Sequence, residues 1–228
     1  MAELAVITGG SRGIGLAIAR GLGRRGLRLA LLAHDEARLR DAVAELTREG
    51  LVATGYLCDV ADEQAMDQTA SQIRETFGTP RVVVANAGVI HRAPVHELSL
   101  AEFDRTLAVN LRGTFLLARA FVADLRRAGH GRFLAIASIS ATLGTAGSSA
   151  YNASKWGVVG FIKSLAEELR GTGVQALAVN PGSVDTAMLA GSPFRAQMLP
   201  DDVARLVTFA ALDAPDAMNG AALDIFGP

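Results

Sequence analysis

Short apolar runs alternate along the whole chain with longer segments of helical period, and this alternation leaves few possible architectures. The runs are rich in Val, Ile and Leu without polar alternation, which is typical of strands covered on both faces. They are Leu4–Thr8, Arg28–Ala33, Val52–Leu57, Arg81–Ala85, Arg132–Ala137, Val174–Asn180 and Ala221–Ile225. The helical segments between them are Ile14–Arg25, Asp35–Glu49, Asp62–Phe77, Ser99–Ala128, Ala150–Leu169 and Asp201–Leu212. Strict alternation predicts an α/β fold: a doubly wound, mostly parallel, seven-stranded sheet in a Rossmann-like three-layer sandwich.

Size and composition indicate one globular domain spanning residues 1–228. The chain is 50% hydrophobic and 20% charged, with a net charge of −1. It therefore has no excess positive field with which to hold nucleic acid or an anionic membrane surface. The single cysteine, Cys58, cannot form an intramolecular disulfide, and no Cys/His cluster has metal-binding spacing. With no basic, apolar leader at the N-terminus and no apolar run of roughly 18–20 residues, we expect a cytoplasmic protein without a metal.

A glycine-rich turn, Thr8-Gly9-Gly10-Ser11-Arg12-Gly13-Ile14-Gly15, lies between the first expected strand and the first expected helix. Glycines here allow backbone N–H groups to approach a pyrophosphate, and the helix N-terminus adds a favourable dipole. The turn therefore predicts a dinucleotide site, with Gly9, Ser11, Arg12, Gly13, Ile14 and Gly15 as its phosphate-binding residues.

The end of the second strand indicates which dinucleotide is bound. Asp35 has the spacing of an acid that grips the ribose 2′-hydroxyl of NAD, but it also stands at a helix start, where an N-cap role explains it fully. The strand ends in Ala33, whereas Arg12 and His34 could both donate to a 2′-phosphate. NADP(H) is favoured over NAD(H), although His34 could equally be an exposed residue at the helix start.

Tyr151 and Lys155 are four residues apart, on one face of an expected helix. A nearby ammonium stabilises a phenolate and so brings the pKa of tyrosine toward neutrality. Ser138 follows the fifth expected strand, where its hydroxyl could polarise a substrate carbonyl. The three side chains together indicate acid–base catalysis on an oxygen.

Taken in order, these motifs resemble the single-domain short-chain dehydrogenases/reductases over essentially the whole chain. The pattern is most similar to that of 3-oxoacyl-acyl-carrier-protein reductases. Besides the glycine turn, the matching residues are Asp59-Val60, Asn86-Ala87-Gly88, Asn110, Ser138, Tyr151 with Lys155, and Asn180-Pro181-Gly182 with Thr186.

The resemblance implies hydride transfer between a nicotinamide and a ketone, aldehyde or secondary alcohol, with Tyr151 as general acid/base. Lys155 would lower the pKa of Tyr151 and bind the nicotinamide ribose, Ser138 would hold the substrate oxygen, and Asn110 would hold a water that links Lys155 to solvent. The further cofactor contacts implied are Asp59 and Val60 at the adenine, Asn86 and Gly88 at the ribose, and Pro181, Gly182, Val184 and Thr186 at the carboxamide. Asn86 and Gly88 could instead stabilise their turn, and Asp59 could act as a local cap.

Residues 183–200 form the only long stretch without a clear period, and we expect them to be a short substrate lid. Apolar residues in and near it, Leu143, Ala146, Met188, Leu189, Phe194 and Met198, favour a carbonyl compound with apolar substituents. His91, His96 and His130 are expected to be solvated loop residues. The family resemblance also implies a homodimer or homotetramer, formed through the helices that carry Asn110 and Tyr151.

Two other functions compete with a reductase or dehydrogenase of small molecules. The first is a 3-oxoacyl-acyl-carrier-protein reductase. Where such reductases would have the arginines that dock the acidic carrier, this chain has Gly129 and Thr172. Arg126, Arg127 and Arg170 lie nearby in the sequence. The second is a non-catalytic dinucleotide-binding sensor, which the intact Ser138, Tyr151 and Lys155 disfavour.

Overall fold

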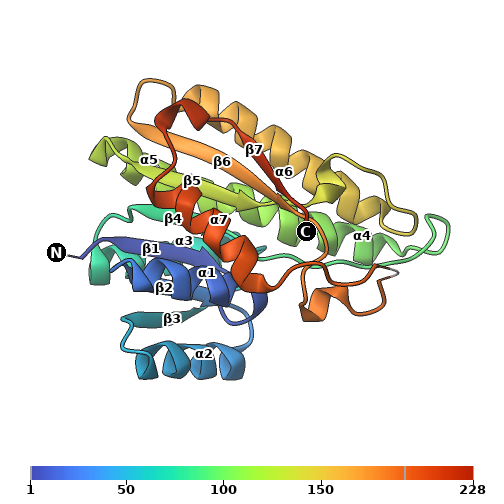
Figure 1. Ribbon diagram of the computed structural model, residues 1–228, viewed down its shortest axis with the longest axis horizontal. Coiled ribbons are helices and arrows are strands. Elements are labelled where there is room, and N and C mark those ends of the chain that lie inside the picture. The colour runs from blue at the N-terminus through green and yellow to red at the C-terminus, as the bar shows by residue number, and fades with distance from the viewer. Residues whose placement is uncertain (1, 193, 228) are drawn as a thin grey trace.

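Seven parallel strands form one sheet in the order β3-β2-β1-β4-β5-β6-β7 (Figure 1). The computed structural model describes residues 2–192 and 194–227, so Pro193 of the expected lid lies outside the described residues. The strands are β1 (Leu4–Thr8), β2 (Arg28–Ala33), β3 (Ala53–Leu57), β4 (Val82–Ala85), β5 (Gly131–Ile136), β6 (Val174–Pro181) and β7 (Ala222–Ile225). The predicted seven-stranded, doubly wound sheet is confirmed.

Helices cover both faces of this sheet. They are α1 (Gly13–Arg24), α2 (Glu36–Arg48), α3 (Glu63–Phe77), α4 (Leu100–Leu107), α5 (Gly113–Ala128), α6 (Ser149–Glu168) and α7 (Pro200–Leu212). Apolar side chains of α1, α2 and α7 join one core cluster, and those of α3, α5 and α6 join the other. The sheet separates the two clusters, which makes the three layers that the sequence predicts.

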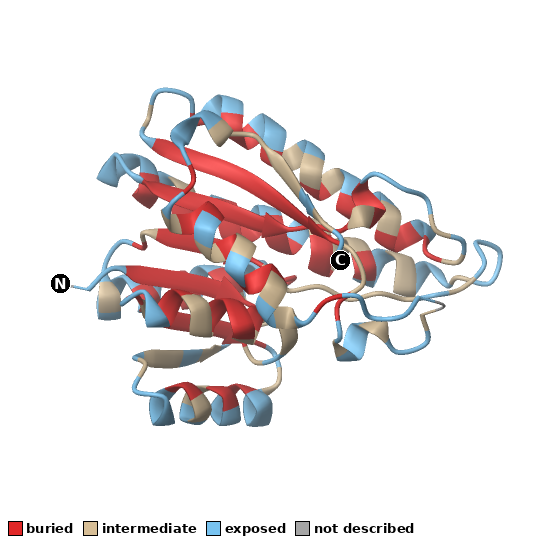
Figure 2. Ribbon diagram, viewed as in Figure 1, coloured by how far each residue is buried: buried red, intermediate tan, exposed pale blue. Residues whose placement is uncertain are grey.

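The outer strands differ from the sequence prediction that the strands are covered on both faces. The central strands are buried, but β3 and β7 at the two edges are only partly so, as Figure 2 shows. Leu57 at the end of β3 is 57% exposed. An edge strand has one neighbour instead of two, so its side chains lose the shielding that inner strands receive.

The long helix predicted over Ser99–Ala128 is continuous but not uniform. It begins with a capping box between Ser99 and Glu102, and a π-helical turn, Ala108–Arg112, interrupts it between α4 and α5. By length and composition alone, the span Leu100–Ala128 is long and apolar enough to cross a membrane. More than half of its most apolar stretch is buried inside the protein, as in the core helix of a globular fold.

All strands end at the same side of the sheet because all are parallel. From β1 the chain continues to β2 and β3 on one side, and it then returns to β4 on the other side of β1. The topological switch point therefore lies between β1 and β4. Open α/β sheets bind ligands in the crevice at such a switch point, beyond the carboxyl ends of the strands. Thr8, Ala85, Ile136 and Pro181 end their strands at this edge.

Candidate active site

A cavity of about 1030 Å³ opens at the carboxyl ends of the strands. Its walls include every predicted site residue except Asn110. They are Gly9, Ser11, Arg12, Gly13, Ile14, Gly15, His34, Asp59, Val60, Asn86, Gly88, Ser138, Tyr151, Lys155, Pro181, Gly182, Val184 and Thr186. The fold therefore brings residues far apart in the sequence to one place.

The glycine turn begins this cavity. Gly9 and Gly13 adopt φ angles of +64° and +53°, in the left-handed region that glycine tolerates best. At Gly15, a Cβ atom would lie 2.2 Å from the Gly9 carbonyl oxygen and 2.4 Å from Asn86 Nδ2. Because these glycines have no side chains, the backbone of the turn stays accessible to an anionic group at the N-terminus of α1.

Asn86 holds the glycine turn in place. Its side-chain Nδ2 donates to the carbonyl oxygens of Thr8 at 3.0 Å and Gly9 at 3.2 Å. In return, Thr8 Oγ1 accepts the backbone N–H groups of Asn86 at 3.0 Å and Ala87 at 3.1 Å. The structural role considered for Asn86 is therefore present, and it fixes β4 against β1 at the switch point.

The residues at the end of the second strand differ in whether they line the cavity. Asp35 is the N-cap of α2, because its Oδ1 accepts the Arg38 backbone N–H at 3.0 Å, and its Oδ2 lies 3.2 Å from Arg38 Nε. Asp35 does not belong to the cavity wall, whereas Ala33, His34 and Arg12 do.

Asp59 lies in the same part of the cavity. Its Oδ1 accepts the Ala61 N–H at 3.0 Å, and its Oδ2 accepts Arg105 Nη1 at 2.9 Å. Partial burial opposes ionisation, but these two hydrogen bonds hold the pKa of the Asp59 carboxyl below its usual value. Asp59 is therefore a local cap as well as a wall residue, and it is charged at neutral pH.

Tyr151 on α6 and Ser138 after β5 face each other across the other end of the cavity. Both are buried, each with 8% of its surface exposed. Burial raises the pKa of Tyr151, while hydrogen bonding with Ser138 and the positive charge of Arg92 act in the opposite direction. Ser138 also caps a short 3₁₀ turn, Ile139–Ala141, because its Oγ accepts the Ser140 N–H at 3.1 Å. The turn orients this hydroxyl.

Lys155 lies one helical turn from Tyr151. Its Nζ is 5.6 Å from the centroid of the Tyr151 ring and donates to the Ile136 carbonyl oxygen at 2.8 Å. Burial lowers the pKa of Lys155 to about 8, so the side chain is mainly protonated at pH 7. The two groups are neighbours as predicted; that the ammonium lowers the pKa of Tyr151 stays a prediction.

Asn110 does not line the cavity, but it hydrogen-bonds the neighbouring residues Val89 and Ser154. Its Oδ1 accepts the Val89 N–H at 2.8 Å, and its Nδ2 donates to the Val89 carbonyl at 3.0 Å and to Ser154 Oγ at 2.9 Å. Asn110 stands in the π-helical turn, a feature that often marks functional positions. A Cβ atom on Gly88 would lie 3.4 Å from Asn110 Oδ1 and 3.7 Å from Lys155 Nζ, so the glycine keeps the space between them open.

The wall residues that were missed or misjudged from the sequence include two arginines and a histidine. Arg92 and Arg105 line the cavity, although neither stands in a recognisable motif. His91, expected to be solvated, is partly buried in the wall, and its Nδ1 lies 3.0 Å from Thr106 Oγ1. These residues come from the segment after β4 and from α4, which only the tertiary fold brings over the site.

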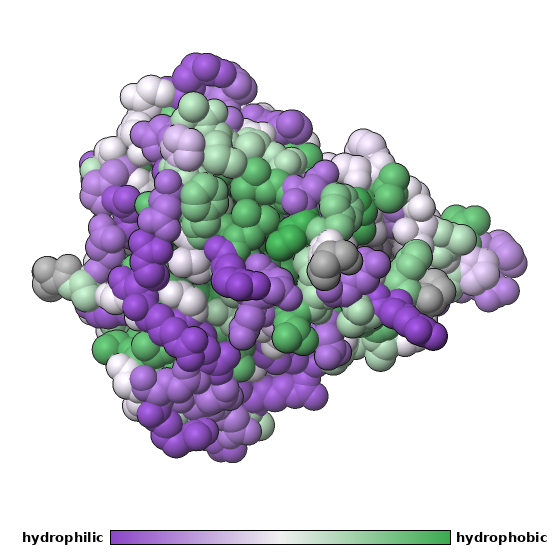
Figure 3. Space-filling view, viewed as in Figure 1, coloured by the Kyte–Doolittle hydropathy of each residue, from purple (hydrophilic) through white to green (hydrophobic). Residues whose placement is uncertain are grey.

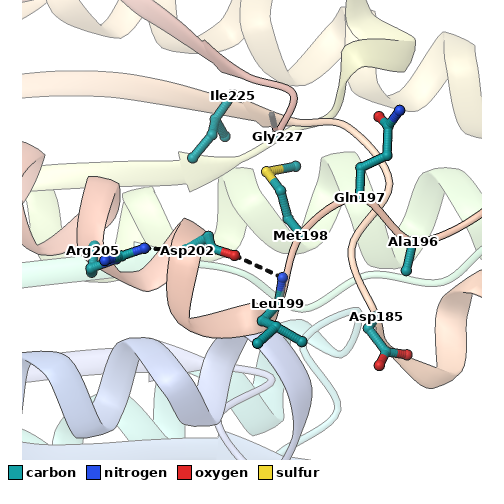
Figure 4. A pocket seen from close by; sticks show the side chains of 9 residues that line it. All are labelled: Asp185, Ala196, Gln197, Met198, Leu199, Asp202, Arg205, Ile225 and Gly227. Carbon is teal, nitrogen blue, oxygen red and sulfur yellow. Dashed lines mark hydrogen bonds and ion pairs between the residues drawn. The ribbon is translucent and has the colours of Figure 1, made fainter.

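A second hollow of about 600 Å³ lies behind residues 183–200, and Figure 4 shows its lining. Here Val184 pairs with Met198 as a β-bridge, the Asp185 N–H donates to the Met198 carbonyl at 2.9 Å, and the Asp202 carboxylate accepts the Leu199 N–H at 2.9 Å. The base of residues 183–200 is therefore fixed to the start of α7. Asp185 and Gln197 line both the hollow and the main cavity, so the two adjoin at this base.

Comparison with known proteins agrees with this geometry. Residues 3–194 match the family model described as short chain dehydrogenase. D-threitol dehydrogenase of Mycolicibacterium smegmatis is 36% identical, with 99% of this chain and 92% of that protein covered. Cis-4-hydroxycyclohexanecarboxylate dehydrogenase of Sinomonas cyclohexanicum is 35% identical, with 99% and 95% covered.

Among solved structures, a variant of actinorhodin polyketide ketoreductase with NADPH superimposes with a TM-score of 0.94. It is 31% identical, with 99% of this chain and 96% of that chain covered. The sheet order, the cavity at the switch point and the matched residues lead to one conclusion: the chain is an oxidoreductase that belongs to the short-chain dehydrogenase family.

Proposed function

We propose that this protein is an NADP(H)-dependent oxidoreductase that transfers a hydride between the nicotinamide and a small ketone, aldehyde or secondary alcohol. The observation that carries the proposal is the meeting of Ser138, Tyr151 and Lys155 with the glycine turn in one cavity. Relatives named for dehydrogenation of threitol and of a hydroxycyclohexanecarboxylate support an alcohol or ketone substrate.

A bound nicotinamide would supply or accept the hydride, and the proton is handled by residues of this chain. In the reductive direction, the Tyr151 hydroxyl donates a proton to the substrate oxygen, and Ser138 donates a hydrogen bond to the same atom. Lys155 places a positive charge beside the phenol and stabilises the phenolate that forms. Water held by Asn110 in the space beside Gly88 would link Lys155 to solvent.

The shape of the cavity fits a dinucleotide. A phosphate needs backbone donors and no side chains in the way, which the turn at Gly9, Gly13 and Gly15 provides. Asp59 and Val60 would contact the adenine, Asn86 and Gly88 the ribose, and Pro181, Gly182, Val184 and Thr186 the carboxamide, since all of them line the wall. Residues 183–200 would act as the lid.

The activity is tested by mixing the protein with NADPH and a panel of ketones and following absorbance at the nicotinamide band. We expect turnover by wild type and a loss of at least about a hundredfold in Tyr151→Phe, because a general acid typically contributes 10²–10⁴-fold. The variant should still bind NADPH, which separates loss of chemistry from loss of folding. Turnover by Tyr151→Phe at the wild-type rate would refute the assignment.

NADP(H) preference rests on Arg12 and His34, because Asp35 is occupied as a helix cap. A guanidinium bonded to a 2′-phosphate contributes roughly 1.5–3 kcal/mol. Arg12→Ala should therefore weaken NADPH binding at least about tenfold and change NADH binding little. Arg48→Ala, at the far end of α2, is the matched control and should leave both affinities unchanged. Equal losses for NADPH and NADH in Arg12→Ala would contradict the preference.

Contacts made by two of the three nearby arginines disfavour an acyl-carrier-protein substrate. Arg127 pairs with Asp124 at 3.1 Å, and Arg170 pairs with Glu167 at 2.7 Å. Both therefore have an acid three residues earlier in the chain beside them, which weakens the positive field that an acidic carrier would need.

Two exposed apolar surfaces support a homodimer or homotetramer. On α5 and α6, Trp156 is 55% exposed, and Phe115 packs edge-to-face on Phe161 with ring centroids 6.3 Å apart. On the opposite side, Figure 3 shows apolar surface over α7 and β7. Phe209 of α7 and Phe226, which follows β7, are exposed. Such surfaces on two faces fit one or two kinds of subunit contact.

The composition and charge fit a cytoplasmic enzyme.

A further inference from the structure

Arg92 is a cation at the substrate end of the cavity that the proposed reaction does not use. It lies on the segment after β4 and lines the cavity together with Ser138 and Tyr151. Its guanidinium reaches across to the expected lid and donates to the carbonyl oxygens of Met188 at 3.4 Å and Ala190 at 3.3 Å. The side chain therefore shares a cavity wall with the catalytic residues and contacts the lid.

The backbone that carries Arg92 is held on both sides. Before it, Val89 is bonded through its N–H and C=O to Asn110, and His91 contacts Thr106. After it, the Ala93 N–H donates to the Gly147 carbonyl at 3.0 Å, in the loop that follows Ser138. The base of the side chain is thus fixed relative to the catalytic hydroxyls, as a binding residue requires.

The guanidinium itself is held weakly. Its contacts to the two lid carbonyls are longer than the 2.7–2.9 Å typical of a charge-assisted hydrogen bond. Within residues 2–192 and 194–227, no carboxylate lies within 4 Å of it. The cavity cation Arg105, by contrast, is paired with Asp59 at 2.9 Å. Arg92 therefore has a planar set of donors available for an anion.

Arg92 also lies near the catalytic centre, because it lines the same cavity as Ser138 and Tyr151, and its positive charge opposes the rise in the pKa of Tyr151. An anion bound to Arg92 would therefore stand at the same end of the cavity as the reacting oxygen, and one substrate could contact both. Apolar residues of the same cavity wall, such as Leu143 and Met188, suit the carbon chain that would join the two groups.

From these contacts we propose that Arg92 binds a carboxylate carried by the substrate, so that the enzyme acts on keto acids or hydroxy acids in preference to their neutral counterparts. The inference rests on the proposed oxidoreductase function. An arginine fork accepts the two oxygens of a carboxylate side by side, which gives orientation as well as attraction. The substrate would then replace the lid carbonyls as partner of the guanidinium.

The test compares a homologous series of straight-chain keto acids, each beside its methyl ester, with NADPH as reductant. Esterification removes the charge and keeps the ketone. For wild type we expect kcat/KM for the best acid to exceed that for its ester by about tenfold or more, as a hydrogen bond to a charged group would give. In Arg92→Gln the ratio of acid to ester should fall to about one, mainly through KM for the acid.

Two variants make this readout specific. Arg92→Lys keeps the charge but not the planar fork, so it should recover part of the preference for acids. Arg48→Gln removes an exposed arginine at the far end of α2 that is not part of the described cavity wall, and it should keep the wild-type ratio. Arg92 also contacts the lid, so its loss could lower kcat/KM for the acid and the ester alike. Such a common effect cancels in the ratio of acid to ester, which therefore reports on recognition of the carboxylate alone.

An equal loss for acid and ester in Arg92→Gln, or a wild-type preference for the esters, would overturn the proposal. If one of these two results is found and wild type still reduces neutral ketones, the proposed oxidoreductase function is retained and only the role of Arg92 is refuted. Failure to reduce every acid and ester, together with failure to bind NADPH, would instead remove the proposed function and this inference with it.

Discussion

Replacing Gly15 by alanine tests the dinucleotide cradle directly. A Cβ atom there would lie 2.2 Å from the Gly9 carbonyl oxygen and 2.4 Å from Asn86 Nδ2, whereas ordinary contacts begin at 3.4 Å. The turn and the start of α1 must therefore separate by about 1 Å. Crowding of this kind costs roughly 1–3 kcal/mol, and alanine returns up to about 1 kcal/mol through its higher helix propensity. We expect a net loss of about 1–2 kcal/mol in the free energy of unfolding.

The same displacement should weaken cofactor binding by more than tenfold, because the backbone donors at the N-terminus of α1 move away from the phosphates. Urea unfolding followed by circular dichroism gives the stability change, and NADPH fluorescence titration gives the affinity. Gly144→Ala is the stability control, since nothing lies within 4 Å of a Cβ there and its φ is not left-handed; its unfolding midpoint should not fall. Wild-type stability and wild-type NADPH affinity in Gly15→Ala would refute the reasoning.

Three further predictions concern the pKa of Lys155, the cap at Asp35 and the surface at Trp156. The pKa of Lys155 is about 8 in the folded protein and 10.5 without burial. Between these two pH values the unfolded chain binds more protons than the folded protein. The free energy of unfolding should therefore rise with pH in this range, by at most about 3 kcal/mol. Urea midpoints at pH 7.5 and about 9.5, below the titration of Tyr151, should show this rise in wild type and lose it in Lys155→Met; an identical rise in both would contradict it. Asp35→Ala should cost about 1 kcal/mol of stability and leave the ratio of NADPH to NADH affinity unchanged, because the carboxylate caps α2; a shift toward NADPH would show that Asp35 reaches the ribose. Trp156→Glu should yield a smaller species in sedimentation velocity, and an unchanged species would place any subunit contact elsewhere.

Much of the fold follows from the sequence because its determinants are local. The buried strands are nearly continuous apolar runs, so β1 and β2 begin and end at the predicted residues. The glycine turn could be recognised from its composition and its place between a strand and a helix. In both cases neighbouring residues contain the information, and tertiary contacts only reinforce it.

The π-helical turn at Asn110 could not be predicted in this way. Its side-chain partners are Val89 and Ser154, which belong to other segments, so the reason for the irregular turn lies outside the helix. Arg92 and Arg105 raise the same difficulty, because an arginine in a polar segment resembles any solvated residue until the fold places it over a cavity. The partial exposure of β3 likewise depends on its place at the sheet edge.

The turns at the amino-terminal side of the sheet have a practical consequence. Those at Gly50 and Gly78 join a helix to the next strand on the side opposite the cavity, and each glycine has open space around it. Exposed turns of this kind accept inserted residues with little effect on the folded core. An affinity tag or fluorophore placed there would let the enzyme be immobilised with its reactive crevice facing the bulk solution.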